Sequence, residues 1–168
     1  MKKTPAWASG LAGSRVLFID PGIEGTGVAF FPLLQYRPPE RTFAREGREY
    51  GGTWQRKAHY LAGWVKECIA ETKPDNVVIE FPVAFQSAKS HAAIANGSLF
   101  KLVFLIGLYD AEVIKTTWGT ARLVGADVWK GQLPKNVVDA RIKLAWGEEY
   151  PEHVSDAVGM GLAATGNL

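Results

Sequence analysis

The sequence predicts an α/β protein with a single mixed five-stranded β-sheet that carries helices on both faces. Two segments, residues 15–20 and 76–80, are continuously apolar, which is typical of strands buried on both sides. A turn and a second apolar segment follow the first of them, so the chain starts with a hairpin. Helical and strand-like segments then alternate, and no repeat or low-complexity linker divides the 168 residues.

The elements follow from local residue types, taken in chain order. Residues 1–14 contain proline and glycine without periodicity, so we expect a flexible tail there and one folded domain over residues 15–168. The turn at residues 21–25 (Pro-Gly-Ile-Glu-Gly) joins the first two strands. The remaining expected elements are strands at 26–31 and 41–45, a helix at 54–72, a strand at 76–80, a loop at 81–89, a helix at 90–116, a strand at 121–128, and helices at 136–145 and from 151 or 152 onward.

Charge and cysteine content narrow the class of protein. The net charge is only +2, but residues 115–143 hold six bases against two acids and residues 37–66 hold seven against three. Such local excess fits nucleic-acid binding, and it fits an ordinary solvated surface equally well. The single cysteine, Cys68, excludes an internal disulfide scaffold. No secretory signal or bilayer-length apolar stretch is present, so we expect a cytosolic protein without membrane contact.

Two buried strands each end in a carboxylate, at Asp20 and Glu80. Functional groups in α/β sheets gather at strand ends, and two neighbouring carboxylates repel each other unless a cation or a shared proton neutralises them. Their hard oxygen atoms suit Mg²⁺ or Mn²⁺. The alternative is that Asp20 simply begins an Asp-Pro-Gly turn. The position of Glu80, between Val-Val-Ile and Phe-Pro, indicates a functional role more strongly than that of Asp20 does.

A third candidate group lies near the C-terminus, in Glu-His-Val-Ser-Asp-Ala. His153 and Asp156 are three residues apart, so on a helix they share one face. Asp156 offers another oxygen ligand, and His153 could ligate a metal or deprotonate an attacking water. An ordinary helix start with solvated side chains explains the same spacing.

Three motifs in this order resemble the RuvC family of Holliday-junction resolvases, which have the RNase H-like fold. The motifs are Asp20-Pro-Gly with Thr26-Gly, Pro74-Asp through Glu80, and His153-x-x-Asp-Ala, and the similarity extends from about residue 16 to 163. The resemblance implies an RNase H-like nuclease domain at 15–168. It implies that Asp20, Glu80, His153 and Asp156 are the catalytic and metal-binding positions, with two Mg²⁺ or Mn²⁺ ions per active site.

The resemblance also implies a function and partners. It predicts a crossover junction endodeoxyribonuclease in DNA recombination and repair, acting on four-way junctions as a homodimer. Products with 5′-phosphate and 3′-hydroxyl ends are expected. The apolar faces of residues 98–109 could form the dimer interface or pack in the core. An actin-like ATPase needs a second phosphate loop, which the sequence lacks, so we expect no nucleotide cofactor.

DNA contacts are expected in two loops. The segment Trp-Lys-Gly-Gln-Leu-Pro-Lys resembles the lysine-bearing loop of the family, which implies phosphate contacts by Lys130 and Lys135. In the loop after Glu80 the better-known enzymes have an aromatic residue where this chain has Val83. Either Phe85 takes over stacking there, or this branch opens DNA differently. We also expect Gln86 and Lys89 to face the DNA.

Two alternative functions fit the same fold. A broader nuclease for flaps, forks and Y-junctions would use the same acids, and Val83 makes that class credible. A catalytically silent junction-binding domain would lack one or more carboxylates, whereas all the candidate ligands are present. We assign no chemistry to five of the six tryptophans, which could serve packing; they are Trp54, Trp64, Trp118, Trp129 and Trp146.

Overall fold

A computed structural model describes residues 4–83 and 88–168, with the side chains of residues 88–91 outside the description. Its sheet has five strands in the order β3-β2-β1-β4-β5. Strand β1 is antiparallel to β2 and parallel to β4, so the sheet is mixed, as predicted. The strands are β1 (Val16–Asp20), β2 (Thr26–Phe31), β3 (Arg41–Arg45), β4 (Asn76–Phe81) and β5 (Arg122–Gly125).

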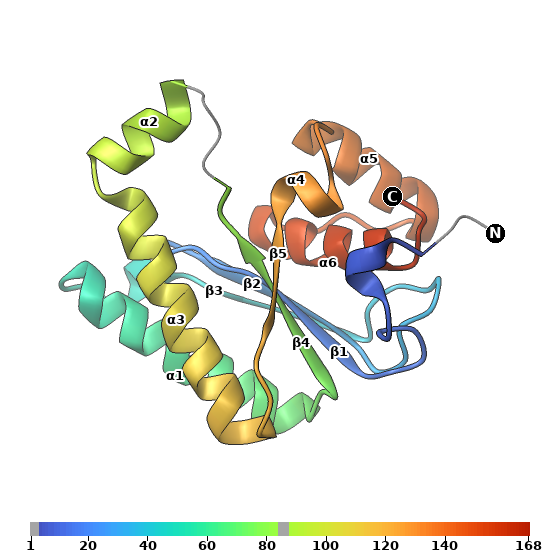
Figure 1. Cartoon of the computed structure of the whole chain (residues 1–168), viewed down its shortest axis with the longest axis horizontal. Coiled ribbons are helices and arrows are strands. Elements are labelled where there is room, and N and C mark those ends of the chain that lie inside the picture. Colours follow the sequence, from blue (N-terminus) through green and yellow to red (C-terminus); the bar gives the residue numbers. More distant parts are fainter. Residues whose placement is uncertain (1–3, 84–87) are drawn as a thin grey trace.

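Helices cover both faces of this sheet (Figure 1). One layer contains α1 (Trp54–Thr72) and α3 (Ser98–Thr117), and the other contains α4 (Ala126–Trp129), α5 (Lys135–Trp146) and α6 (Glu152–Ala164). Alternate side chains of β1 enter the two cores, with Leu17 and Ile19 toward α1 and α3 and Phe18 toward α6. Because both faces are covered, β1 and β2 are buried at every position, which explains their continuous apolar sequence.

Two predicted elements differ from the structure. The expected long helix at 90–116 is two helices, α2 (Ala88–Ala95) and α3, because Gly97 has a φ of 73° that interrupts a right-handed helix. The expected strand at 121–128 is shorter, since the chain turns into α4 after Gly125. The other predicted helices and strands are confirmed to within a few residues at their ends.

The expectation of a flexible tail over residues 1–14 is wrong for the described part of that segment. Residues Ala6–Ala8 form a short 3-10 helix, and Ala8 and Leu11 are buried in the core beneath α6. Arg122 donates hydrogen bonds to the carbonyl oxygens of Trp7 and Ser9 and so ties the segment to β5. Two buried apolar side chains are enough to dock a segment, yet they carry no periodic signal.

None of the helices described in residues 4–83 and 88–168 combines the length and the apolarity that crossing a membrane requires.

Candidate functional site

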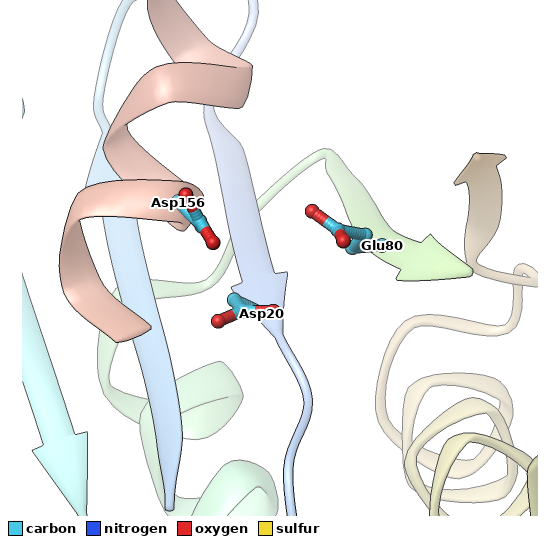
Figure 2. A group of neighbouring side chains, drawn as sticks. All are labelled: Asp20, Glu80 and Asp156. Atoms are coloured by element: carbon cyan, nitrogen blue, oxygen red, sulfur yellow. The ribbon is translucent and has the colours of Figure 1, made fainter. Parts of the chain in front are cut away.

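Three carboxylates from three different elements meet at one edge of the sheet. Asp20 ends β1, Glu80 lies near the end of the parallel neighbour β4, and Asp156 lies in the second turn of α6. One oxygen atom from each can be chosen so that all three atoms lie within 4.8 Å of one another. Figure 2 shows the three side chains around a common space between the strand ends and α6. The sequence-based expectation that Asp20 and Glu80 approach each other is therefore confirmed.

The glycines of the first turn allow α6 to lie directly on the hairpin. Gly27 pairs with Asp20 across the hairpin, and a Cβ atom at Gly27 would lie 2.2 Å from the carbonyl carbon of His153. A Cβ at Gly25 would lie 2.8 Å from the His153 ring. Since real Cβ atoms do not come this close to backbone atoms, Gly27 requires glycine, while a side chain at Gly25 would displace the imidazole of His153. The turn motif therefore serves to bring His153 and Asp156 to the end of β1.

Burial makes the acid cluster electrostatically costly for the protein alone. Desolvation raises the pKa of Asp20, an effect that the hydrogen bond with His153 opposes. Burial, and next the charge of Asp20, raise the pKa of Glu80 to about 7. Carboxylates held in such surroundings favour either protonation or a bound cation.

His153 lies beside the cluster and not within it. Its Nδ1 atom is 3.1 Å from Oδ2 of Asp20. This hydrogen bond raises the pKa of His153, while partial burial opposes the rise. The His153 side chain is 38% exposed, so solvent reaches the imidazole. The ring can therefore orient Asp20 through one nitrogen atom and exchange a proton through the other.

Two lysines predicted from the sequence to bind phosphate lie at the same cluster. Lys135 Nζ is 3.0 Å from Oδ1 of Asp156, and Lys130 Nζ is 3.7 Å from Oδ2. Lys135 also donates to the carbonyl oxygen of Glu152 and lies 3.5 Å from Asp139. Both ammonium groups are thus held next to the carboxylates, where a phosphate bound at the cluster would meet them.

The other expected DNA contacts have different outcomes. Phe85 and Gln86 lie outside the described residues; Lys89 lies in α2, and its side chain is outside the description. Val83 lies against the end of β5, where its Cγ2 atom would be 2.7 Å from a Cβ at Gly125.

The basic segment at 37–66 loses much of its charge excess in three dimensions. Arg41 forms an ion pair with Glu71, and Lys57 pairs with Glu24, both acids lying outside the segment. Arg48 pairs with Glu46 inside it. The structure therefore favours the solvated-surface interpretation for this segment.

Sequence reasoning missed one residue at the site. The indole Nε1–H of Trp129 donates a hydrogen bond of 2.9 Å to Oε2 of Glu80. Trp129 is one of six tryptophans, and its neighbours in sequence do not distinguish it from a packing residue. Its position directly before Lys130, in the loop predicted to bind DNA, was the available signal.

The raised pKa of Glu80 predicts a pH-dependent gain of stability in Glu80→Gln. Its carboxyl has a pKa of about 7 in the folded chain against an ordinary value of 4.5, so ionisation of Glu80 opposes folding. That penalty is absent below pH 4.5, grows between the two values and is complete above pH 7. Without metal, we expect Glu80→Gln to unfold with a free energy about 3 kcal/mol higher at pH 8 and nearly unchanged at low pH.

Urea unfolding in the presence of a chelator, at pH 4.5 and at pH 8, measures this difference. Glu149→Gln is the control, because Glu149 is exposed and its pKa is lowered by Lys143. A stability difference for Glu80→Gln that does not change with pH would contradict the electrostatic origin.

Solved structures of known proteins support the fold. No protein-family model matches the sequence, and no curated protein does. A structure of Thermus thermophilus RuvC in complex with Holliday junction substrate is similar, with a TM-score of 0.70 and 19% identity over 89% of this chain and 90% of that chain. A second Thermus thermophilus RuvC structure has a TM-score of 0.66 and 16% identity over 89% and 92%. The predicted RNase H-like fold, in the form that RuvC has, is confirmed.

Proposed function

We propose that this protein is a metal-dependent endonuclease that resolves Holliday junctions in DNA recombination and repair. One observation carries the proposal, namely that Asp20, Glu80 and Asp156 converge within 4.8 Å at the sheet edge while two lysines contact the same cluster. Three acids alone would repel DNA. Acids that hold cations, with ammonium groups beside them, form a site that accepts a phosphodiester.

The donor set fits Mg²⁺ or Mn²⁺. All three cluster members offer hard carboxylate oxygens, and Asp20 is only 9% exposed, so little water is available to screen the negative charges. Asp20, Glu80 and Asp156 would hold two ions, with His153 as a further position at the edge. Bound ions of this kind lower the pKa of a water nucleophile and stabilise charge on the leaving oxygen.

The other side chains have roles that their positions suggest. His153, oriented by Asp20 and partly exposed, would accept a proton from the attacking water. Lys130 and Lys135, which contact Asp156, would bind the non-bridging oxygens of the phosphate.

A homodimer would give a four-way junction two active sites. The buried side chains of α3, among them Leu105 and Tyr109, pack toward α1. Other apolar side chains of α3 stay in solvent, and Phe100 is 71% exposed. An exposed apolar helix face of this kind supports an interface with a second copy. The similar Thermus thermophilus structure was determined with Holliday junction substrate, which supports branched DNA as the ligand.

A broader nuclease for flaps, forks and Y-junctions is the second candidate. It is favoured by Val83, which stands where the resembling family has its stacking aromatic and which packs against the end of β5. A small aliphatic side chain held against the sheet cannot stack on the bases of an opened junction.

A cleavage assay tests these proposals together. The substrates are an immobile four-way junction, a flap, a fork and a linear duplex, each incubated with and without Mg²⁺. Paired symmetric nicks in the four-way junction alone would support the resolvase and its dimer. Comparable cutting of flaps and forks would favour the second candidate. Tight junction binding without cutting would indicate a silent binding domain.

Lys130→Ala and Lys135→Ala are each expected to weaken junction binding about 5-fold at moderate salt. Each loses one phosphate contact, so the slope of log affinity against log salt should fall by about 1. A salt series of fluorescence-anisotropy titrations measures both effects. Lys143→Ala is the control, because that lysine lies on α5 but is 61% exposed and paired with Glu149. An unchanged salt slope would mean that the two lysines do not contact the DNA phosphates.

A further inference from the structure

We propose that Trp129 is a positioning residue that fixes the Glu80 carboxylate for metal binding. The inference rests on the proposed metal centre and extends it to a residue outside the acid cluster. The hydrogen bond from Trp129 Nε1 to Glu80 Oε2 is 2.9 Å long and joins α4 to β4. One carboxylate oxygen of Glu80 is thereby held, and the other stays available to a cation.

The indole is itself rigidly placed. Trp129 is only 5% exposed and belongs to the core between the sheet and α6. A Cβ at Gly159 of α6 would lie 3.0 Å from its ring, so the indole packs flush against that helix. Glu80 and Val124 are partners in the β4–β5 register, and α4 begins two residues after Val124. The strand pair β4–β5 therefore places Glu80 directly, and it places Trp129 through α4, which follows β5.

The chemistry of an indole restricts what Trp129 can do. Its N–H is a donor only, so it cannot ligate a metal, and it carries no charge that would compete with a cation. A neutral donor orients the carboxylate and leaves its charge intact, as hydrogen-bond partners of metal ligands generally do.

The Trp129 ring also contacts Lys130. Lys130 Nζ lies 4.8 Å from the centre of the Trp129 ring, at cation–π distance, and 3.7 Å from Asp156. The edge of one indole thus contacts an acid of the cluster while its face holds a base. A substitution that removes the N–H but keeps an aromatic ring at this place separates the two effects.

Trp129→Phe is the test, because phenylalanine keeps an aromatic ring in the core but removes the N–H. We expect its Mn²⁺ dissociation constant, measured by calorimetry without DNA, to rise about 10-fold. Trp146→Phe is the matched control. Trp146 lies at the end of α5 against Phe31, at the opposite end of β2 from Gly27, and its buried Nε1 has no hydrogen-bond partner among the described residues.

A second readout does not depend on the variant folding well. The indole N–H resonance of Trp129 should shift when Mg²⁺ is added to the wild-type protein. It should also differ between the wild type and Glu80→Gln, while the Trp146 resonance stays in place in both comparisons. The inference would be overturned if Trp129→Phe bound Mn²⁺ with unchanged affinity. It would also be overturned if the Trp129 indole resonance shifted neither on Mg²⁺ addition nor in Glu80→Gln.

The same experiments distinguish failure of the inference from failure of the proposed function. Mn²⁺ binding weakened by Trp129→Phe, in a protein that cuts no branched DNA, would uphold the positioning role and refute the nuclease. Absence of Mn²⁺ binding by the wild type would refute the metal centre and the inference together.

Discussion

Asp20→Asn is expected to lower junction cleavage by on the order of 10³-fold while junction binding is retained or slightly strengthened. Asp20 is the most buried of the three acids and is the one that contacts His153. An amide keeps the shape of the side chain and removes its charge, so the site loses an anionic ligand and the orienting partner of its imidazole. The lost negative charge also lessens repulsion of phosphate, which is why binding survives.

Single-turnover cleavage and a binding titration in Ca²⁺ measure the two quantities separately. Asp75→Asn is the matched control, since Asp75 lies before the other end of β4 and pairs with Arg15 near the surface. It should cleave at the wild-type rate. Cleavage by Asp20→Asn within a few-fold of the wild type would exclude Asp20 from the metal site. Loss of junction binding with the fold intact would count against the assignment as well.

The positions of the acids could be predicted from the sequence because strand ends leave a local signature. Asp20 and Glu80 each close a run of apolar residues, and the parallel pairing of β1 with β4 places these strand ends side by side. The spacing of three residues and the family resemblance predict Asp156 and His153 as site residues. Their arrival over β1 depends on the contact of Gly27 with the backbone of α6, which only the folded chain shows.

Other features could not be predicted because they depend on contacts between distant segments. Trp129 contacts Glu80 across 49 positions of sequence, and nothing near it marks the indole as different from the other tryptophans. Leu11 is fully buried in a segment with too few apolar residues to show periodicity. The break between α2 and α3 did have a local sign, Gly97, but an isolated glycine is tolerated in many helices.

Gly27→Ala is expected to lower the free energy of unfolding by about 3 kcal/mol. The added methyl would lie 2.2 Å from the carbonyl carbon of His153 and 2.4 Å from the backbone nitrogen of Val154. Backbone atoms cannot rotate out of the way, so α6 must move off β2 as a unit. Because α6 carries Asp156 as well as His153, the shift also separates the acid cluster.

Gly27→Ala should also slow cleavage, because α6 holds both the fold and the acid cluster in place. A displacement of about 1 Å in a catalytic group can cost about 10²-fold in rate, so cleavage by the folded fraction of Gly27→Ala should fall by that order. Gly63→Ala is the control, because a Cβ at Gly63 in α1 meets nothing within 4 Å. Alanine there should stabilise the helix by up to about 1 kcal/mol and leave cleavage unchanged. Full cleavage by a destabilised Gly27→Ala would mean that α6 returns to its place despite the methyl, and that the glycine serves stability alone. Loss of both properties would show that the fold and the proposed chemistry depend on the same close contact.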